Sequence, residues 1–333
     1  MTNFWKESPN PVFALAPMED VTDTVFREMV LCVTDPGRLQ VLYTEFTNVD
    51  GMNHPVGKLR VGERLIVNDS EKVLLHRLNV KLVAQVWGKD PEIFHKVVNE
   101  ISATGLFDGI DINMGCPVKN VVKNGCCSAL IGMPQLAKEI IQATKESTHL
   151  PVSIKTRTGL SKHITEKWIS NLMEARPAAI VLHGRTQKQQ SDGLADWEQI
   201  SLGARIRNEI DPQVAFLGNG DVTSYDDGLQ KIEQYGLDGV MIGRGIFQNP
   251  WFFSNDQHDR SSNERIDLML QHTKLYQETW GAEKNFNILK RFFKIYASNF
   301  NGASQLRQEL MLTNNYDEVL HCVENFRNSY IRE

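Results

Sequence analysis

Eight short runs of apolar and β-branched residues recur along the chain, and they constrain the fold more than any other feature. They lie at residues 12–17, 39–45, 80–87, 108–114, 151–157, 178–184, 214–220 and 238–244. Most of them are apolar almost continuously, which is typical of parallel strands that are covered on both faces. Helical spacing of apolar residues marks four of the segments between them, at 23–33, 91–102, 133–147 and 165–175. Strands that alternate with helices in this way predict a (β/α)₈ TIM barrel, with an open doubly wound sheet as the structural alternative.

The chain changes character after Phe253. Residues 254–265 are polar and loop-like, and the sequence beyond them has helical patterns but no strand-like run. A barrel of this type needs roughly 250 residues, which leaves the remainder of the 333 residues for an appendage. We therefore predict a barrel domain over 1–254 and a small all-helical domain over 255–333.

Composition excludes several classes of protein. The net charge is −5, so a nucleic acid could be bound only through a local basic patch. No apolar run reaches the roughly 18 residues of a membrane span, and the opening MTNFWKESPN lacks the features of an export signal. The five cysteines are scattered and odd in number. We expect a reduced, cytoplasmic protein that does not contact a membrane.

Polar residues gather where the predicted strands end, and barrel enzymes carry their chemistry at the carboxyl ends of the strands. Cys116 stands out because Gly115 and Pro117 hold it in a loop rather than in a strand. Lys155 stands out because an unpaired buried lysine is costly. The set comprises Ala16, Pro17, Met18, Glu45, Gln85, Asn113, Cys116, Lys155, Arg157, His183, Arg185, Asn219, Gly220, Asp221, Gly243 and Arg244.

Two glycine-bearing turns, 218–221 and 242–245, follow the seventh and eighth runs. Barrels commonly hold a phosphate on backbone N–H groups at these two places, and Arg244 could pair with its charge. The sequence therefore predicts an anion site there.

Other interpretations of single residues remain open. His183 taken alone could be a hydrogen-bonded structural residue. Cys116, Cys126 and Cys127 could suggest a metal site, but a gap of ten residues followed by adjacent thiols does not match the paired spacings of zinc or iron–sulfur ligands. We expect no metal.

Six motifs in order resemble the tRNA-dihydrouridine synthases, a family of FMN-dependent TIM-barrel enzymes. They are APMEDVTDTVFR, DINMGCPVKNVVKNGCCSAL, VSIKTRTG, VLHGRT, LGNGDV and GVMIGRG, and the resemblance runs from about residue 10 to about 255, with a weaker echo in the helical tail. It implies that NADPH reduces FMN, that hydride then passes to C6 of specific uridines in tRNA, and that Cys116 protonates C5 as general acid, giving 5,6-dihydrouridine.

The resemblance also implies roles for the other residues. Ala16, Pro17 and Met18 would lie near the isoalloxazine ring. Gln85 and Lys155 would bond its polar edge, with His183 beside them. The phosphate would rest on Asn219, Gly220, Asp221, Gly243 and Arg244. Asn113, Arg157 and Arg185 would hold the uracil. Two departures stand out, since Glu19-Asp20 replace small residues of many relatives and Cys126-Cys127 replace Gly or Ala.

In this family the helical tail contacts tRNA, and here the segment 287–296 places Lys290, Arg291 and Lys294 among aromatic residues. If this segment is one helix, Lys290 and Lys294 share a face, which could bind RNA or simply face solvent. We expect tRNA as the partner of a monomeric enzyme. The rival functions are a flavoenzyme acting on a free pyrimidine and a non-catalytic RNA-binding or chaperone-like protein.

Overall fold

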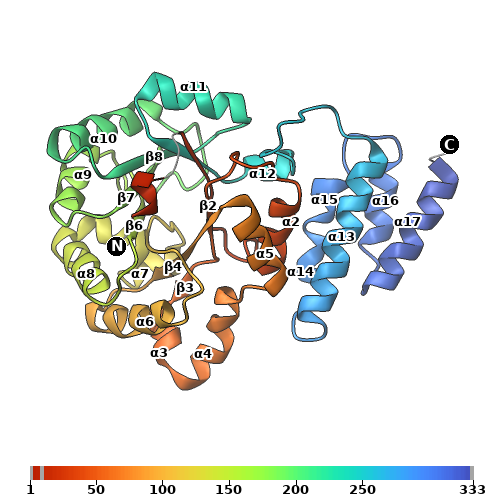
Figure 1. Cartoon of the computed structure of the whole chain (residues 1–333), viewed down its shortest axis with the longest axis horizontal. Coiled ribbons are helices and arrows are strands. Elements are labelled where there is room, and N and C mark those ends of the chain that lie inside the picture. Colours follow the sequence, from red (N-terminus) through yellow and green to blue (C-terminus); the bar gives the residue numbers. More distant parts are fainter. Residues whose placement is uncertain (1–2, 8–10, 331–333) are drawn as a thin grey trace.

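The computed structural model describes residues 3–7 and 11–330, and its central element is a closed barrel of parallel strands (Figure 1). The ring consists of β1 (Val12–Leu15), β2 (Val41–Tyr43), β4 (Lys81–Trp87), β5 (Gly109–Met114), β6 (Val152–Arg157), β7 (Ala179–His183), β8 (Ala215–Asn219) and β9 (Gly239–Ile242). Each predicted run contains one of these strands. The ring closes because β1 pairs with both β2 and β9. This confirms the (β/α)₈ barrel and excludes the open sheet, which would leave two strand edges unpaired.

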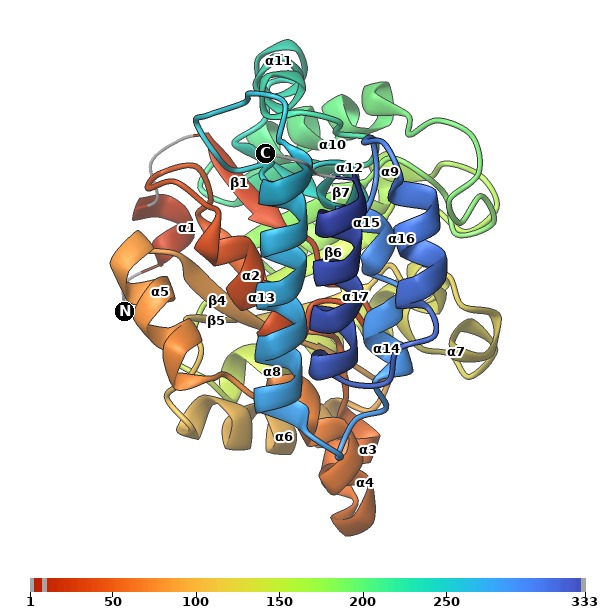
Figure 2. The same ribbon diagram turned by 90° about the vertical axis from the view of Figure 1, so that its right-hand side faces the viewer.

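A short strand that was not predicted, β3 (Thr47–Asn48), continues the line of β2 along β4. The chain then forms α3 (Val49–Asn53), α4 (Pro55–Val61) and a 3₁₀ turn, η1 (Gly62–Leu65). The α3–α4 hairpin projects from the body of the molecule (Figure 2). Helix α5 (Asp69–Leu78) returns the chain to β4.

Helices cover the outside of the barrel, and all four predicted helical segments are confirmed. They form α2 (Thr24–Cys32), α6 (Pro91–Ala103), α8 (Pro134–Glu146) and α9 (Thr165–Glu174), followed by α10 (Trp197–Ile210), α11 (Tyr225–Tyr235) and α12 (Gly245–Gln248), with α7 (Lys119–Lys123) and η2 (Cys127–Gly132) after β5. Local sequence explains where they begin. The Asp23 carboxylate accepts from the N–H of Phe26 at the start of α2, and Asp90 does the same before Pro91 in α6.

The core has two layers, because successive residues of a strand face opposite sides. Val12 and Ala14 of β1 belong to the cluster inside the barrel, whereas Phe13 and Leu15 belong to the cluster under the helices. The short helix α1 (Phe4–Glu7) adds Phe4 and Trp5 to the inner cluster. Phe4 lies close to Gly109, the first residue of β5, so α1 closes the amino end of the barrel.

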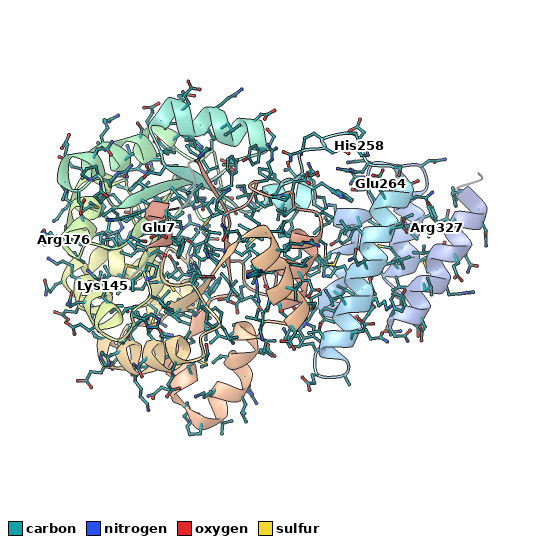
Figure 3. The ribbon with its side chains drawn as sticks, in the orientation of Figure 1. Glu7, Lys145, Arg176, His258, Glu264 and Arg327 are labelled. Atoms are coloured by element: carbon teal, nitrogen blue, oxygen red, sulfur yellow. The ribbon has the colours of Figure 1, made fainter. Side chains whose placement is uncertain are left out.

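The described part of the tail, residues 255–330, contains helices and no strand. They are α13 (Ser262–Trp280), α14 (Asn287–Lys290), α15 (Phe293–Tyr296), α16 (Ala303–Leu310) and α17 (Tyr316–Tyr330). Helix α13 packs against α2, and the indole N–H of Trp280 donates to Asp23 over 2.9 Å. In the polar linker His258 contacts Asp256 and Glu264, and Glu264 also completes a capping box with Ser261. Figure 3 labels His258 and Glu264 near the start of α13.

The ends of the two predicted domains, at residues 1 and 333, lie outside the described residues, as does part of the opening segment used to judge export. Over the described residues, no helix combines the length and the apolar character needed to span a bilayer.

Candidate active site

A cavity of about 490 Å³ opens at the carboxyl ends of β1, β6, β7, β8 and β9. It brings together twelve of the predicted residues and six others. The predicted ones are Ala16, Pro17, Met18, Lys155, Arg157, His183, Arg185, Asn219, Gly220, Asp221, Gly243 and Arg244, and the others are Gln190, Ser191, Val222, Thr223, Gly245 and Gln248. Val222 and Thr223 directly follow the first glycine turn and Gly245 is the last residue of the second, so the sequence indicated their position, whereas no sequence signal marks Gln190, Ser191 or Gln248.

Lys155 on β6 is partly exposed to this cavity. Its ammonium donates to the side-chain oxygen of Asn219 over 3.1 Å, and the Asn219 amide is in turn fixed by the carbonyl of Met241 at 2.8 Å. Burial, helped by the charge of Arg157, lowers the pKa of Lys155 to about 8. Lys155 is therefore a fixed cation that can also give up its proton near neutral pH.

His183 at the end of β7 is a neutral imidazole. Burial, together with the cations Lys155 and Arg157, lowers its pKa well below 6.5. The Nη1 of Arg185 lies 3.3 Å from its Nε2, and because a guanidinium can only donate, Nε2 is the acceptor. This contact assigns the ring proton to Nδ1.

Arg185 and Asp221 form a two-bond ion pair across the mouth, at 2.8 and 2.6 Å. Arg185 is only 2% exposed and also donates to the carbonyl of Gly193, while Asp221 accepts from the N–H of Ala195. The pair thus fixes the loop after β7. Both side chains are largely occupied within the protein, which sequence reasoning did not anticipate.

The two glycine turns meet at the far side of the cavity. Gly220 has φ +123°, and a Cβ there would lie 2.6 Å from the Cβ of Ala195. A Cβ on Gly245 would lie 2.5 Å from the carbonyl of Val222, so only glycine permits this close approach. Arg244, 62% exposed, stands beside them with its Nη2 3.4 Å from Asp221.

The charge of the cavity is strongly positive. Its lining includes four cationic side chains, Lys155, Arg157, Arg185 and Arg244, and one carboxylate, Asp221. With His183 neutral, the net charge of the lining is +3. Such a lining favours an anionic ligand.

Arg157 connects two loops of the mouth. Its guanidinium donates to the carbonyls of Gly115, Thr186 and Gln190 at 2.8 to 3.0 Å, and it is 7% exposed. Burial lowers its pKa to about 10. Arg157 thereby ties the loop that bears Cys116 to the loop after β7.

Cys116 is half-buried in the loop after β5. The side-chain oxygen of Asn113 accepts from the N–H groups of Gly115 and Cys116, both at 3.0 Å, and the Ser128 hydroxyl donates to the Cys116 carbonyl at 2.8 Å. These bonds hold the backbone on both sides of the thiol.

The pKa of Cys116 is lowered from 9.0 to about 7. The main cause is a hydrogen bond from the Cys127 thiol, and burial opposes it, while the Val118 N–H and the charge of Arg157 lower it further. Cys127 itself is fully buried, and burial raises its pKa, so it remains a thiol that can donate. Cys116 is therefore poised to give or take a proton near neutral pH.

The Cys116 side chain is not among those that line the cavity, and neither are Gln85 and Asn113. Gln85 is fully buried and Asn113 is 6% exposed, and the two amides bond each other over 3.0 Å in the barrel interior. The two amides lie behind the Cys116 loop rather than in the mouth.

The predicted helix over 287–296 is broken, so the expectation that Lys290 and Lys294 share one exposed helical face is wrong. Helix α14 ends at Lys290 and α15 begins at Phe293. Lys290 is 8% exposed, and its ammonium donates to the carbonyl of Met311 at 2.9 Å. Lys294 is exposed.

Arg291 reaches toward the barrel mouth, where its Nη2 lies 3.7 Å from the Asp20 carboxylate. Glu45, at the end of β2, is 3% exposed and accepts from the N–H of Asp20. Burial raises the pKa of Glu45 to about 7. These acids lie between the barrel and the tail and outside the cation-lined cavity.

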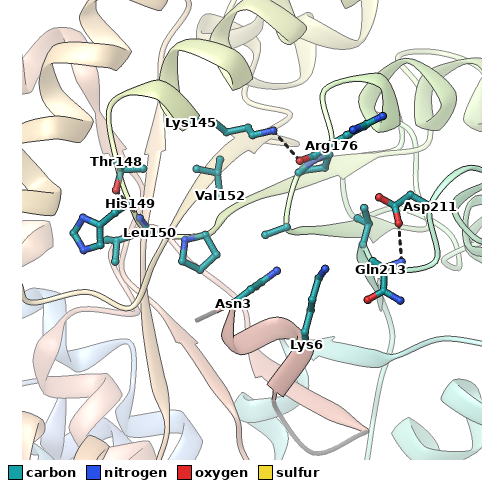
Figure 4. Close-up of a pocket in the computed structure, with 14 residues that line it drawn as sticks. Asn3, Lys6, Lys145, Thr148, His149, Leu150, Val152, Arg176, Asp211 and Gln213 are labelled. Carbon is teal, nitrogen blue, oxygen red and sulfur yellow. Dashed lines mark hydrogen bonds between the residues drawn. The ribbon is translucent and has the colours of Figure 1, made fainter. Parts of the chain in front are cut away.

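A second cavity, of about 370 Å³, lies at the opposite end of the barrel beside α1 (Figure 4). Lys145 on its wall donates to the carbonyls of Ala175 and Arg176 at the end of α9. The cation thus stabilises the end of a helix. Since barrels of this type carry their chemistry at the carboxyl ends of the strands, we assign the active site to the first cavity.

All five cysteines are free thiols. Across residues 3–7 and 11–330, no three or more His, Cys, Asp or Glu side chains gather in a way that could hold a metal ion.

Comparison with known proteins points in one direction. The sequence pattern of the family described as "Dihydrouridine synthase (Dus)" matches residues 14–331. A Bacillus subtilis protein named "Probable tRNA-dihydrouridine synthase 2" is 42% identical over 99% of this chain and 98% of its own length. A Staphylococcus aureus protein named "Probable tRNA-dihydrouridine synthase" is 43% identical over 97% and 95%, and a Staphylococcus epidermidis protein of that name is 42% identical over 97% and 96%. Together with the closed barrel and its polar mouth, these matches show that the chain belongs to the dihydrouridine synthase family.

Proposed function

We propose that this protein reduces specific uridines in tRNA to 5,6-dihydrouridine, using FMN and consuming NADPH. The names of its relatives support the substrate and the product. The observation that carries the chemistry is the half-buried Cys116 thiol, with its lowered pKa, in a loop tied by Arg157 to the rim of the cation-lined cavity.

The residues of the cavity suit FMN. Its phosphate would rest on the two glycine turns, at Asn219, Gly220, Asp221, Gly243 and Arg244, where the close backbone approach and the exposed Arg244 offer N–H donors and a charge. The net positive lining suits both this phosphate and a reduced ring. When bound and reduced, FMN supplies a hydride for C6 of the uracil.

Other residues would position the ring. Ala16, Pro17 and Met18 would pack against it, because pairing of the Ala16 N–H with the Ile242 carbonyl at 2.8 Å carries this segment to the mouth. Lys155 and His183, which line the cavity, would face its polar edge. Gln85 lies behind the residues that line the cavity, so it could reach this edge only if they moved aside.

Cys116 would act as the general acid. Addition of hydride at C6 places negative charge on the uracil, and a proton delivered to C5 relieves it. The acid form of Cys116 is the thiol, which predominates below its pKa of about 7. Arg157 and Arg185, which line the cavity, would hold the uracil with the N–H groups that are not used in contacts within the protein. Asn113 lies behind the Cys116 loop and would act on the uracil site by holding the N–H groups of Gly115 and Cys116.

The target uridine must leave the stacked RNA, at a cost of a few kcal/mol that contacts to the RNA backbone offset. We propose that residues 1–254 carry the reaction and that the tail, 255–333, contributes to tRNA binding through Arg291 and Lys294. Lys290 contributes to the tail's fold instead. Free thiols and a tRNA substrate support a cytoplasmic location.

The proposal is tested with Cys116→Ala and the matched control Cys126→Ala, whose thiol faces the Asn124 carbonyl instead. Both purified proteins should be yellow. The first should form dihydrouridine more slowly by a factor of about 10² to 10⁴, whereas the second should stay within a few-fold of the wild type. Full activity of Cys116→Ala, colourless wild-type protein, or reduction of free pyrimidines without tRNA would each contradict the proposal.

A further inference from the structure

Four side chains and two backbone groups form a continuous chain of hydrogen bonds from the Cys116 loop into the barrel interior. The N–H groups of Gly115 and Cys116 donate to Asn113 Oδ1 at 3.0 Å. Asn113 Nδ2 donates to Gln85 Oε1 at 3.0 Å, and Gln85 Nε2 donates to Asp111 Oδ2 at 2.7 Å. The Ser153 hydroxyl donates to the other oxygen of Asp111 at 2.6 Å. The chain therefore ends on one carboxylate.

The two ends determine the direction of every bond. Backbone N–H groups can only donate, so Asn113 must turn its oxygen toward the Cys116 loop and its NH₂ toward Gln85. An ionised carboxylate can only accept, so Gln85 must turn its NH₂ toward Asp111. Flipping either amide would place two donors or two acceptors face to face. The N–H donors at one end and the acceptor at Asp111 thus require the same orientation of both amides, and Asp111 supplies the acceptor that Gln85 needs in that orientation.

Stability alone does not explain this carboxylate. Asp111 and Gln85 are fully buried, and Asp111 has no ion pair among the described residues. Val83 and Val181 belong to the apolar cluster inside the barrel, whereas the groups that bond or face Asp111 are polar, namely Gln85, Ser153 and Lys155. Burying a carboxylate is costly even when two hydrogen bonds and the nearby cation Lys155 offset part of the cost, so this buried charge is weak evidence of a contribution to stability. Burial raises the pKa of Asp111 to about 6, which still leaves it mostly ionised at neutral pH.

We propose that Asp111 is a positioning residue that, through Gln85 and Asn113, fixes the backbone of the Cys116 loop and so the place of its thiol. The inference rests on the proposed function only in that the proposed function makes the Cys116 thiol the general acid. Asp111 touches neither the cavity nor the thiol. Its effect passes through the side-chain amides of Gln85 and Asn113, because it fixes which end of each amide is the oxygen and which is the NH₂ group.

Alkylation of Cys116 by iodoacetamide tests this without flavin or tRNA. The rate is followed against pH on the Cys116 peptide by mass spectrometry, because other free thiols also react. In wild type the midpoint should lie near pH 7. Asp111→Leu removes the acceptor, and Gln85→Leu breaks the chain in the middle. Both should move the midpoint toward the ordinary value of a free cysteine, which lowers the rate at pH 7 by up to about fifteenfold.

Two further variants separate positioning from general destabilisation. Asp111→Asn keeps an oxygen for Gln85 and offers its NH₂ to Ser153, so its midpoint should stay near that of wild type. Ser153→Ala removes a buried hydrogen bond at the same carboxylate but keeps every link between Asp111 and the Cys116 loop, and it should lower the melting temperature without moving the midpoint. The double variant Asp111→Leu/Gln85→Leu should move it no further than either single one.

Unchanged midpoints in folded Gln85→Leu and Asp111→Leu would overturn the inference, and so would a shift in Asp111→Asn as large as that in Asp111→Leu. If Asp111→Leu does not fold, Gln85→Leu and Asp111→Asn decide. Loss of the proposed function would show separately, as dihydrouridine formation that survives in Cys116→Ala while the alkylation midpoints still move.

Discussion

Replacing Cys127 by alanine should move the alkaline limb of the pH–rate profile to higher pH. The Cys127 thiol is the main cause of the lowered pKa of Cys116, about 7 instead of 9.0. Under the proposed mechanism the thiol form of Cys116 donates the proton, so activity should be retained below this pKa and should fall about tenfold per pH unit above it. With a pKa of 7, about a tenth of Cys116 is protonated at pH 8, and with a pKa near 9 about nine tenths would be.

The rate at pH 8, relative to the plateau at pH 6, should therefore rise by up to about tenfold in Cys127→Ala. The plateau itself should fall by a small factor, because a weaker acid donates its proton more slowly. Single-turnover dihydrouridine formation with pre-reduced enzyme and saturating tRNA measures both. Cys126→Ala is the control, since its thiol faces the Asn124 carbonyl. If the limb of Cys127→Ala coincides with that of wild type, Cys127 does not set the pKa of the proton donor.

Three other changes probe the scaffold and the mouth. Glu71→Gln leaves the Arg27 guanidinium without its carboxylate, and both side chains are 0% exposed. Urea unfolding should show that the free energy of unfolding falls by about 3 to 5 kcal/mol. The control Glu19→Gln, at the partly exposed pair with Arg64, should lower it by at most about 1 kcal/mol. Burial lowers the pKa of His272 to about 3, so below pH 6.5 the unfolded chain binds a proton that the native state does not, and stability falls by about 1.4 kcal/mol per pH unit. His272→Asn should abolish this part of the pH dependence, which is measured as the difference in unfolding free energy between pH 7 and pH 5. Lys155→Met should weaken FMN binding by about ten- to a hundredfold in a fluorescence titration, whereas the exposed Lys162→Met should not.

The strands were predictable because their signal is local. Continuous apolar runs and helical spacing are properties of neighbouring residues, and all eight strands and four helices followed from them. The insertion with β3, α3 and α4 was missed because such short elements carry too little periodic pattern. The helix expected over 287–296 divides at Arg291 and Phe292, where packing of the tail overrides local spacing.

The place of most of the proposed site residues also followed from the sequence. In a closed parallel barrel, residues that end their strands must meet at one rim, and twelve of the predicted residues line one cavity there. Their partners did not follow. Arg185 is bound by Asp221, Arg157 by three carbonyls and Lys290 by Met311, in each case through contacts between segments that are distant along the chain or in separate loops.

The sequence by itself thus determined the barrel, the rim at which its polar residues meet and the glycine turns, since these depend on periodicity and on backbone conformations that individual residues impose. Only the tertiary structure decided which polar groups remain free for a ligand. Cys127 stands beside Cys116, and Asp111 ends a chain of bonds that begins in the Cys116 loop, because closure of the barrel and folding of its loops bring these groups together. A hydrogen bond needs its two atoms within about 3 Å, and nothing in local spacing specifies that distance.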